Sequence, residues 1–320
     1  MRAIVPGLVL LAASSAANAA TTPYHLIPGR VPLDWQGPDG NTVVLDAPKG
    51  LIVIDTGRSP KHAQAILDYA ATLHRPIAAI VNTHWHLDHT TGNYDLRQVY
   101  PDAKVYASTA IEGALLTFLA KGLSGPDKAL SNPAVPQARK DQILRGRYRI
   151  ANPDTLRPTD AIVKSGKMTI AGRTLDVHLA KFAATEGDVW LYDPKSRTVM
   201  VGDLVVGIVP FMDTACPDGW RKALSEISGV PFRTLIPGHG AVMSRADFAA
   251  WRTAYDRFVD CGHSNADKKT CVDGWSRDAA KFIDPGHRDY VREAADYYLT
   301  SRLRSSPEEQ QRYCKPLKAS

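Results

Sequence analysis

The sequence predicts a layered α/β protein, in which helices cover a sheet that contains parallel strands. Three neighbouring segments support this prediction: two strands within residues 41–57, a helix over 60–73 and a strand over 77–81. The last strand, IAAIV, is a continuous apolar run, which is typical of a strand buried on both faces. A strand, a helix and a second buried strand in succession form the βαβ unit of such proteins.

Turn and capping residues set the limits of the first elements. NTVVLDAPKGLIVIDTG predicts two strands joined by a turn at residues 48–50. Ser59, followed by proline, indicates the start of the first helix. Thr109 and Glu112 have the spacing of a capping box before a further helix, which we expect to end at Gly122.

The second half of the chain is predicted to alternate strands with turns and to end in helices. Residues 122–158 are rich in Pro, Gly, Asn and basic residues, so we expect a long connection or a lid there. Asp218 is expected to cap a helix that continues to Ile227, and RTLIPGHG (233–240) is expected to be a strand that enters a turn. The remaining strands are expected at 161–164, 168–170, 174–180, 189–193 and 198–201, and the C-terminal helices at 245–259, 286–303 and 307–314.

Composition is that of an ordinary globular protein. The chain has 320 residues, of which 44% are hydrophobic and 22% charged, enough for one large domain or two small ones. The net charge is +6, and the densest basic stretch, within 139–149, lacks regularly interleaved aromatic residues. We interpret that stretch as a solvated face and expect no nucleic-acid partner. No later segment has about twenty apolar residues, so we expect no stable membrane anchor.

The N-terminus has the pattern of a signal peptide over residues 1–20. Arg2 precedes an apolar stretch at 3–13, which is too short to span a bilayer comfortably. The small residues of ANAA then favour cleavage after Ala19 or Ala20. We therefore expect a periplasmic or secreted protein. The alternative interpretation is a buried N-terminal strand.

Four cysteines lie in the second half of the chain: Cys216, Cys261, Cys271 and Cys314. In an oxidising compartment they are expected to form two disulfides, for which three pairings are possible. Cys261 with Cys271 would close the shortest loop. No C-x-x-C spacing occurs, which disfavours a zinc site made of cysteines.

Four metal-capable side chains crowd the segment THWHLDH: His84, His86, Asp88 and His89. Residues two apart in a strand face the same way, so His84 and His86 are expected to point at one ion. Asp88 and His89 follow in the turn and would face a second point a few ångströms away. Two ions about 3.5–4 Å apart suit two-metal hydrolysis. Imidazole and carboxylate ligands favour zinc, with iron and manganese as alternatives.

This H-x-H-x-D-H pattern resembles that of the metallo-β-lactamase superfamily, and three further segments extend the resemblance. VIDTG (53–57) resembles the family's early strand and turn. VGDLV places Asp203 at the position of the metal-bridging aspartate, and IPGHG places His239 at that of the late histidine. Order and spacing agree over about residues 40–243. The resemblance implies an αββα sandwich with the metals in a shallow cleft at one edge.

The resemblance also implies how these side chains share two metals. The first metal is expected at His84 and His86. The second is expected at Asp88, His89 and His239, and Asp203 would bridge the two ions. Asp88 would also orient the nucleophile. A metallo-β-lactamase-like domain would occupy residues 21–243, with a helical extension over 244–320 packed on it.

One position departs from the family's pattern. A third histidine of the first metal normally precedes a Thr-x-Gly-Asp segment, but in AATEGDVW that position is Ala184. A methyl group cannot bind a metal, so the first site is expected to be weak and the protein to hold one or two ions. The replacements considered are Glu186, His178, His263 and His287, and a water molecule is a further alternative.

These features predict an exported zinc-dependent hydrolase that acts on a small molecule. Metal binding brings the pKa of water to about 7, and the resulting hydroxide would attack a lactam, lactone, ester or related bond. The alternatives are a catalytically impaired binding protein, owing to Ala184, and a di-iron redox enzyme, for which the sequence offers no partner domain. Specificity is expected to come from loops at 122–158 and 205–217. The candidate apolar wall there consists of Phe211, Met212 and Trp220.

Overall fold

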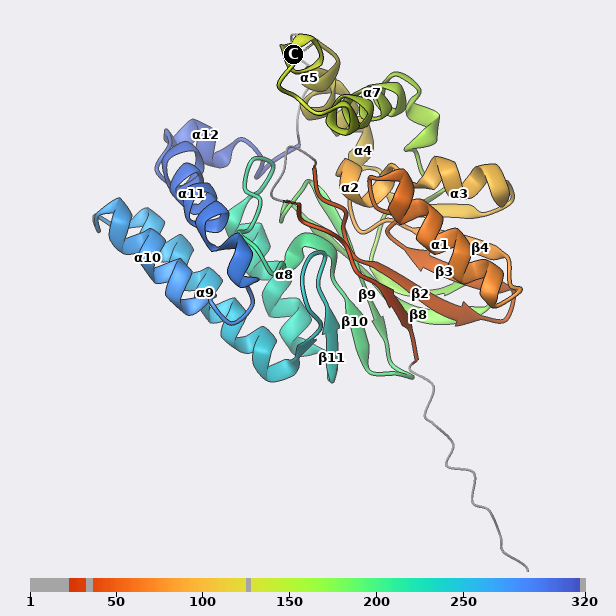
Figure 1. The fold of residues 1–320 in the computed structure, drawn as a ribbon. Helices are drawn as coiled ribbons and strands as arrows, with labels where there is room; N and C mark the ends of the chain where they lie inside the picture. The colour runs from red at the N-terminus through yellow and green to blue at the C-terminus, as the bar shows by residue number, and fades with distance from the viewer. Residues whose placement is uncertain (1–22, 33–36, 125–127, 317–320) are drawn as a thin grey trace, which may run out of the picture.

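Figure 1 shows the computed structural model of the protein, which describes residues 23–32, 37–124 and 128–316. Two six-stranded sheets lie face to face, and helices cover their outer faces (Figure 1). The strand orders are β1-β2-β3-β4-β5-β6 and β12-β11-β10-β9-β8-β7. This is an αββα sandwich with a helical C-terminal region, so the expected fold class is confirmed. The signal peptide expected over 1–20 lies outside the described residues.

The first sheet is built around parallel strands. It contains β1 (His25–Ile27), β2 (Thr42–Ala47), β3 (Gly50–Ile54), β4 (Ile77–Val81), β5 (Lys104–Ser108) and β6 (Asp160–Ile162). From β3 to β6 each strand runs parallel to its neighbour. Parallel strands need crossover connections, which here include α1 (Pro60–Thr72), α2 (Leu87–Thr90) and α3 (Asn93–Val99). Ser59 caps α1 by accepting from the His62 amide, as the sequence predicts.

The second sheet is mostly antiparallel. It contains β7 (Gly166–Ile170), β8 (Arg173–Lys181), β9 (Gly187–Asp193), β10 (Thr198–Met200), β11 (Thr234–Ile236) and β12 (Met243–Ser244). β10 and β11 run parallel, and every residue of β9 is buried. Aliphatic side chains such as Ile52, Val81 and Leu191 fill the space between the sheets. Each fully buried side chain of this kind contributes roughly 1.5–3 kcal/mol, which holds the two sheets together.

The region expected to be a connection or lid is largely helical. It follows α4 (Ala110–Leu116) and contains α5 (Phe118–Ser124), α6 (Lys128–Ser131), α7 (Gln137–Ala151) and a 3₁₀ turn, η1 (Pro153–Thr155). The expected capping box does not form, because Glu112 pairs with Arg157 at 2.8 Å and Thr109 makes no capping bond. The helix also does not end at Gly122. The basic face is not simply solvated, because Arg149 is buried with its guanidinium 3.9 Å from the ring centre of Tyr94.

Helices of the C-terminal region form a layer on the outer side of the second sheet (Figure 1). They are α8 (Pro217–Gly229), α9 (Arg245–His263), α10 (Lys268–Asp278), a 3₁₀ turn η3 (Pro285–His287), α11 (Arg288–Tyr298), a π-helical turn η4 (Leu299–Leu303) and α12 (Pro307–Gln311). α10 was not expected from the sequence. Asp218 lies in the first turn of α8 rather than at its cap, which is Cys216. No helix in the described part of the chain is long and apolar enough to cross a membrane.

Both expected disulfides are present. Cys261 joins Cys271, which links α9 to α10. Cys216 joins Cys314, which links the start of α8 to the segment after α12. The second link closes a long loop and ties the end of the described chain to the turn that precedes α8.

Candidate metal centre

The six side chains expected to bind metal converge at one edge of the sandwich. His84, His86, Asp88 and His89 follow β4, Asp203 lies on the 3₁₀ turn η2 (Gly202–Leu204) after β10, and His239 follows β11. All six are buried. Ligand sites in α/β folds favour the carboxyl ends of strands, and these three strands bring the six side chains together in that way.

The first histidine pair is formed differently from the expectation. β4 ends at Val81, so residues 82–86 form a loop and do not continue the strand. His86 then stands at the N-terminus of α2, which carries Asp88 and His89. The turn brings His84 Nε2 within 2.9 Å of His86 Nδ1. Tertiary folding of the loop, and not strand alternation, therefore makes this pair.

The six side chains form two groups that share Asp203. One group contains Asp88, His89, Asp203 and His239, and the other contains His84, His86 and Asp203. Asp203 Oδ1 lies 3.2 Å from His89 Nε2, and Asp203 Oδ2 lies 3.7 Å from His84 Nε2. His239 Nε2 is 3.2 Å from Asp88 Oδ2. Each oxygen of Asp203 thus faces a different group, an arrangement in which one carboxylate bridges two ions.

A buried hydrogen-bond relay orients two of the histidines. Asp55 Oδ2 accepts from His89 Nδ1 at 2.8 Å and from the Thr83 hydroxyl at 2.7 Å. Because the Thr83 proton goes to Asp55, the Thr83 oxygen accepts from His84 Nδ1 at 3.0 Å. In their neutral forms, His84 and His89 therefore carry lone pairs on Nε2 that face Asp203. Such outer partners commonly fix the tautomer of metal-binding histidines.

Thr214 orients His86 in a similar way, next to Ala184, where the family's pattern has a histidine. Its hydroxyl donates to the backbone oxygen of Ala184 at 2.9 Å and lies 3.2 Å from His86 Nε2. Since the hydroxyl proton goes to Ala184, the oxygen accepts from His86 Nε2–H, and His86 Nδ1 keeps the lone pair. Sequence reasoning missed Thr214, because it is 30 residues from Ala184 and belongs to no motif.

The turn that presents Ala184 is otherwise intact. Asp188 accepts from the Thr185 amide at 2.9 Å and from the Thr185 hydroxyl at 3.0 Å. Burial raises the pKa of Asp188 to about 7. None of the expected replacement ligands joins either metal-capable group of the described residues. Glu186 is directed toward Gly113, His178 stacks on Trp190, His263 lies beside Leu303 and His287 contacts the backbone oxygen of Val31.

The residues present fit a divalent metal ion. His84 Nε2 and His86 Nδ1 both offer lone pairs at 2.9 Å, and two acceptors this close repel unless a cation or proton lies between them. His89 Nε2 and Asp203 Oδ1 are buried without a hydrogen-bond partner in the described residues. A buried polar atom left unpaired costs free energy, which a bound cation would remove.

Electrostatics keep three of these side chains in the forms that bind metal, and they favour a positive charge at the fourth. Burial lowers the pKa of His86 to about 4 and holds that of His84 well below the ordinary value, so both rings are neutral at pH 7. Burial alone would raise the pKa of Asp88, but the nearby charges, chiefly that of His89, hold it well below the ordinary value. For His89, burial is outweighed by Asp203 and the other carboxylates, which raise its pKa and attract any cation at this point.

An aromatic wall stands beside the first group. The ring centre of Phe211 is 5.0 Å from that of His86, and Phe118 stands 6.2 Å from His86 and 5.4 Å from Trp85. The apolar wall expected from the sequence is therefore right for Phe211 only. Met212 and Trp220 lie in the core, and the sequence did not point to Phe118 or Trp85.

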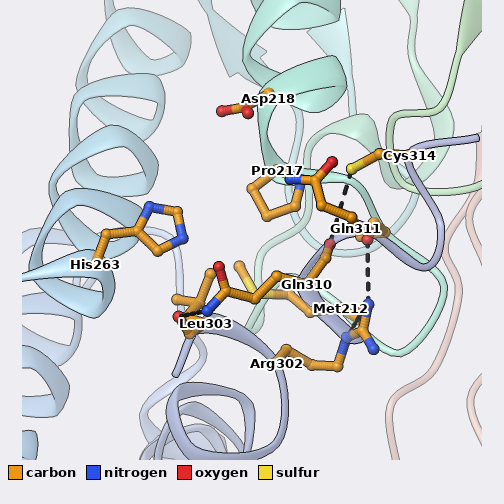
Figure 2. Close-up of a pocket in the computed structure, with 10 residues that line it drawn as sticks. Met212, Pro217, Asp218, His263, Arg302, Leu303, Gln310, Gln311 and Cys314 are labelled. Carbon is orange, nitrogen blue, oxygen red and sulfur yellow. Dashed lines mark hydrogen bonds between the residues drawn. The ribbon is translucent and has the colours of Figure 1, made fainter. Parts of the chain in front are cut away.

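The C-terminal region holds the loop that carries Phe211 and Thr214. Arg302 of η4 donates through Nε to the backbone oxygen of Met212 at 2.9 Å, and the Cys216–Cys314 disulfide fixes the end of the loop. Figure 2 shows Met212, Arg302 and Cys314 around a pocket of about 40 Å³. None of the residues that line this pocket belongs to either metal-capable group. The pocket lies where the C-terminal region contacts the loop that carries Phe211 and Thr214.

Comparison with known proteins identifies the family. A profile described as the metallo-beta-lactamase superfamily matches residues 35–239. A linear primary-alkylsulfatase from Pseudomonas sp. is 25% identical over 224 residues, which cover 63% of this chain and 41% of that protein. A hydroxyacylglutathione hydrolase from Synechococcus sp. is 45% identical over 56 residues, which cover 18% of this chain and 22% of that protein. The chain thus spans less than half the length of either relative.

Solved structures share the fold. The sec-alkylsulfatase Pisa1 from Pseudomonas sp. has a TM-score of 0.52 at 20% identity, over 81% of this chain and 46% of that one. The B3 metallo-beta-lactamase BLEG-1 has a TM-score of 0.51 at 20% identity, over 70% of this chain and 95% of that one. Because the family profile matches more than half of the residues, and the fold and motif order agree with it, this chain belongs to the metallo-β-lactamase superfamily.

Proposed function

We propose that this protein is an exported, zinc-dependent hydrolase of small molecules. The observation that carries the proposal is the pair of buried histidine and aspartate groups that share Asp203. In one group His84 Nε2 and His86 Nδ1 face each other at 2.9 Å, and in the other His89 Nε2 has no hydrogen-bond partner among the described residues. Imidazole and carboxylate are the donors that zinc prefers, and iron and manganese take the same donors less specifically.

The two groups would hold the metal unequally. Asp88, His89 and His239, with Asp203, would bind one ion, and His84 and His86, again with Asp203, would bind the other. Zinc bound there would supply a hydroxide at neutral pH and would stabilise negative charge on the substrate. The second group has its full set of side chains, whereas the first lacks one because of Ala184. We therefore expect one tightly held ion and one weakly held ion.

Residues of the chain would orient and shield the reaction. Asp88 remains ionised, because neighbouring charges hold its pKa low, so it can accept a hydrogen bond from the attacking water. Thr83, Asp55 and Thr214 would keep the histidine lone pairs directed at the ions. Phe118 and Phe211 would exclude water from one side of the cleft. These roles agree with hydrolysis of a lactam, lactone, ester or related bond.

The relatives help to define the substrate class. Their names describe an alkylsulfatase and a hydroxyacylglutathione hydrolase, which act on ester-like bonds. Export is supported by the two disulfides, which persist mainly in oxidising compartments, and by the expected signal peptide. The proposed division remains a signal peptide over 1–20, a catalytic domain over 21–243 and a helical extension over 244–320.

A second proposal is a binding protein with impaired catalysis, which Ala184 favours. Metal analysis of the purified protein, combined with turnover of a chromogenic lactam, a lactone, an aryl ester, a thioester and an alkyl sulfate, separates the two. Bound zinc with turnover of any of these supports the hydrolase. Bound zinc without turnover supports the binding protein, and a protein that binds no divalent metal contradicts both.

A further inference from the structure

Two arginine side chains converge beside the metal centre. Arg58 lies in the loop before α1, and Arg139 lies in the first turn of α7. Gly37 stands between them: a methyl group built on Gly37 would lie 3.2 Å from Arg58 Nη1 and 3.3 Å from Arg139 Nη1. The two guanidinium groups therefore face the same small space, which any side chain larger than glycine would obstruct at this position.

Among the residues that the structure describes, these two positive charges are matched by a single ion pair. Arg58 Nη2 lies 3.4 Å from Asp88 Oδ1, and Arg58 Nε is buried without a hydrogen-bond partner among the described residues. Arg139 Nη1 donates to the neutral amide oxygen of Gln142 at 2.7 Å, and the Gly37 amide donates to that same oxygen at 2.8 Å. Asp88 is shared with the proposed metal, and Asp39 accepts from the backbone amides of Arg58 and Ser59 but forms no ion pair with either guanidinium group in the described part of the chain.

Placing two like charges together in a partly buried site costs free energy unless an anion joins them. Burial, together with the charge of Arg58, lowers the pKa of Arg139, which agrees with this cost. Guanidinium groups bind carboxylate, sulfate and phosphate through paired hydrogen bonds, more strongly than neutral donors do. The site therefore has the composition of a receptor for an oxyanion.

The position of the pair gives the cleft two chemically different sides. Arg58 stands next to Asp88, at the second group of side chains, and Arg139 faces Arg58 across the space at Gly37. Phe118 and Phe211 stand next to His86, at the first group. A molecule lying across both ions would thus meet cations at one end and aromatic rings at the other.

We propose that Arg58 and Arg139 form a subsite for an oxyanion group of the substrate, whose apolar part lies against Phe118 and Phe211. The inference deepens the proposed function and rests on it, because it names the substrate class as amphiphilic anions. The oxyanion chemistry is common to sulfate, carboxylate and phosphate groups, and also to free inorganic anions, so a test must separate a group carried on a tail from a free ion.

Titration calorimetry with sodium hexane-1-sulfonate tests the subsite directly. This probe has an oxyanion, a tail and no hydrolysable ester, so binding is measured whether or not the protein has turnover. We expect Arg139→Gln to weaken binding about tenfold, because it removes a charge-assisted pair. Lys140→Gln, which makes the same charge change one residue along α7, should alter the affinity less than twofold. Arg139→Lys keeps the charge without the planar donor pair and should fall between wild type and Arg139→Gln.

Sodium sulfate and hexan-1-ol serve as the probes for anion and tail alone. Each should bind at least tenfold more weakly than hexane-1-sulfonate. Equal affinities of Arg139→Gln and Lys140→Gln for the sulfonate would overturn the subsite. Sulfate binding as tightly as the sulfonate would overturn its assignment to a substrate group, in favour of a free anion. Metal content and turnover, measured on the same samples, report failure of the proposed function separately.

Discussion

The centre has a fuller half, with Asp88, His89 and His239, and a weaker half, with His84 and His86, and both share Asp203. The two halves differ in what holds their side chains in place. His89, in the fuller half, is oriented by Asp55, which directly follows the buried strand β3. His86, in the half that lacks a ligand, is oriented by Thr214, from a loop that the C-terminal region secures. Asp55 also orients His84 through Thr83, so within the half that lacks a ligand it is His86 that depends on packing between distant parts of the chain.

The contacts of His86 bear on the position where the family's pattern has a histidine and this chain has Ala184. Thr214 links the His86 ring to the backbone of Ala184, so the remaining pair of histidines keeps its orientation without the third ligand. The absence of a third histidine is therefore expected to weaken the binding of one ion and to leave the binding of the other unchanged. Variants that alter one half at a time test this difference in metal affinity.

The largest effect is expected from His239→Ala. This change removes a ligand from the fuller half, so affinity for the tight ion should fall more than 100-fold and turnover should be lost. Zinc analysis after dialysis against a mild chelator measures the result. His178→Ala is the matched control, because His178 stacks on Trp190 away from the centre. Unchanged stoichiometry in His239→Ala would remove His239 from the proposed site.

The second-largest effect is expected to be a gain in metal affinity at the weaker half. Ala184 is buried and its backbone oxygen contacts Thr214, so Ala184→His alone should overpack the site and destabilise the fold by about 1–3 kcal/mol. Combining it with Thr214→Ala makes room for the ring. We expect the double variant to bind the weaker ion about 10- to 100-fold more tightly than Thr214→Ala alone, which zinc titration measures. A double variant with the same affinity as Thr214→Ala alone would show that position 184 does not face the ion.

Thr214→Val should produce a loss of about tenfold at the weaker site. Valine keeps the shape but removes the oxygen that accepts from His86, and outer partners of this kind are worth 10- to 100-fold in metal affinity. Thr214→Ser retains the hydroxyl and should remain near wild type. The tight site should be unaffected in both variants, and an equal loss at both sites would contradict the separation of the two halves.

The smallest effect is expected from the disulfides. Replacing Cys216 and Cys314 by serine loosens the loop that carries Thr214, so the weaker site should lose a few-fold in affinity. The matched pair Cys261→Ser and Cys271→Ser removes a disulfide that joins α9 to α10, and should leave both sites unchanged in protein that remains folded. Titration below the unfolding temperature of each variant, established by circular dichroism, makes this comparison.

The same contrast explains what the sequence could and could not predict. The six proposed ligands of both halves lie in short motifs after strands, where the local pattern carries their chemistry. Thr214 joins the centre only through tertiary packing, so no local pattern identifies it. Similarly, Glu112 has the spacing of a capping box, but Arg157 attracts it instead. The helix α10 was missed because its few apolar residues sit among polar ones, and only packing against α9 reveals their role.

Zinc titration of the wild-type protein tests the central claim most directly. The metal is first removed, and calorimetry then follows its return, with the number of bound ions checked by mass spectrometry under native conditions. The unequal halves predict two binding events, with the first ion bound at least tenfold more tightly than the second. Two equally tight ions would contradict this account, because the half without its third histidine would then be as complete as the other.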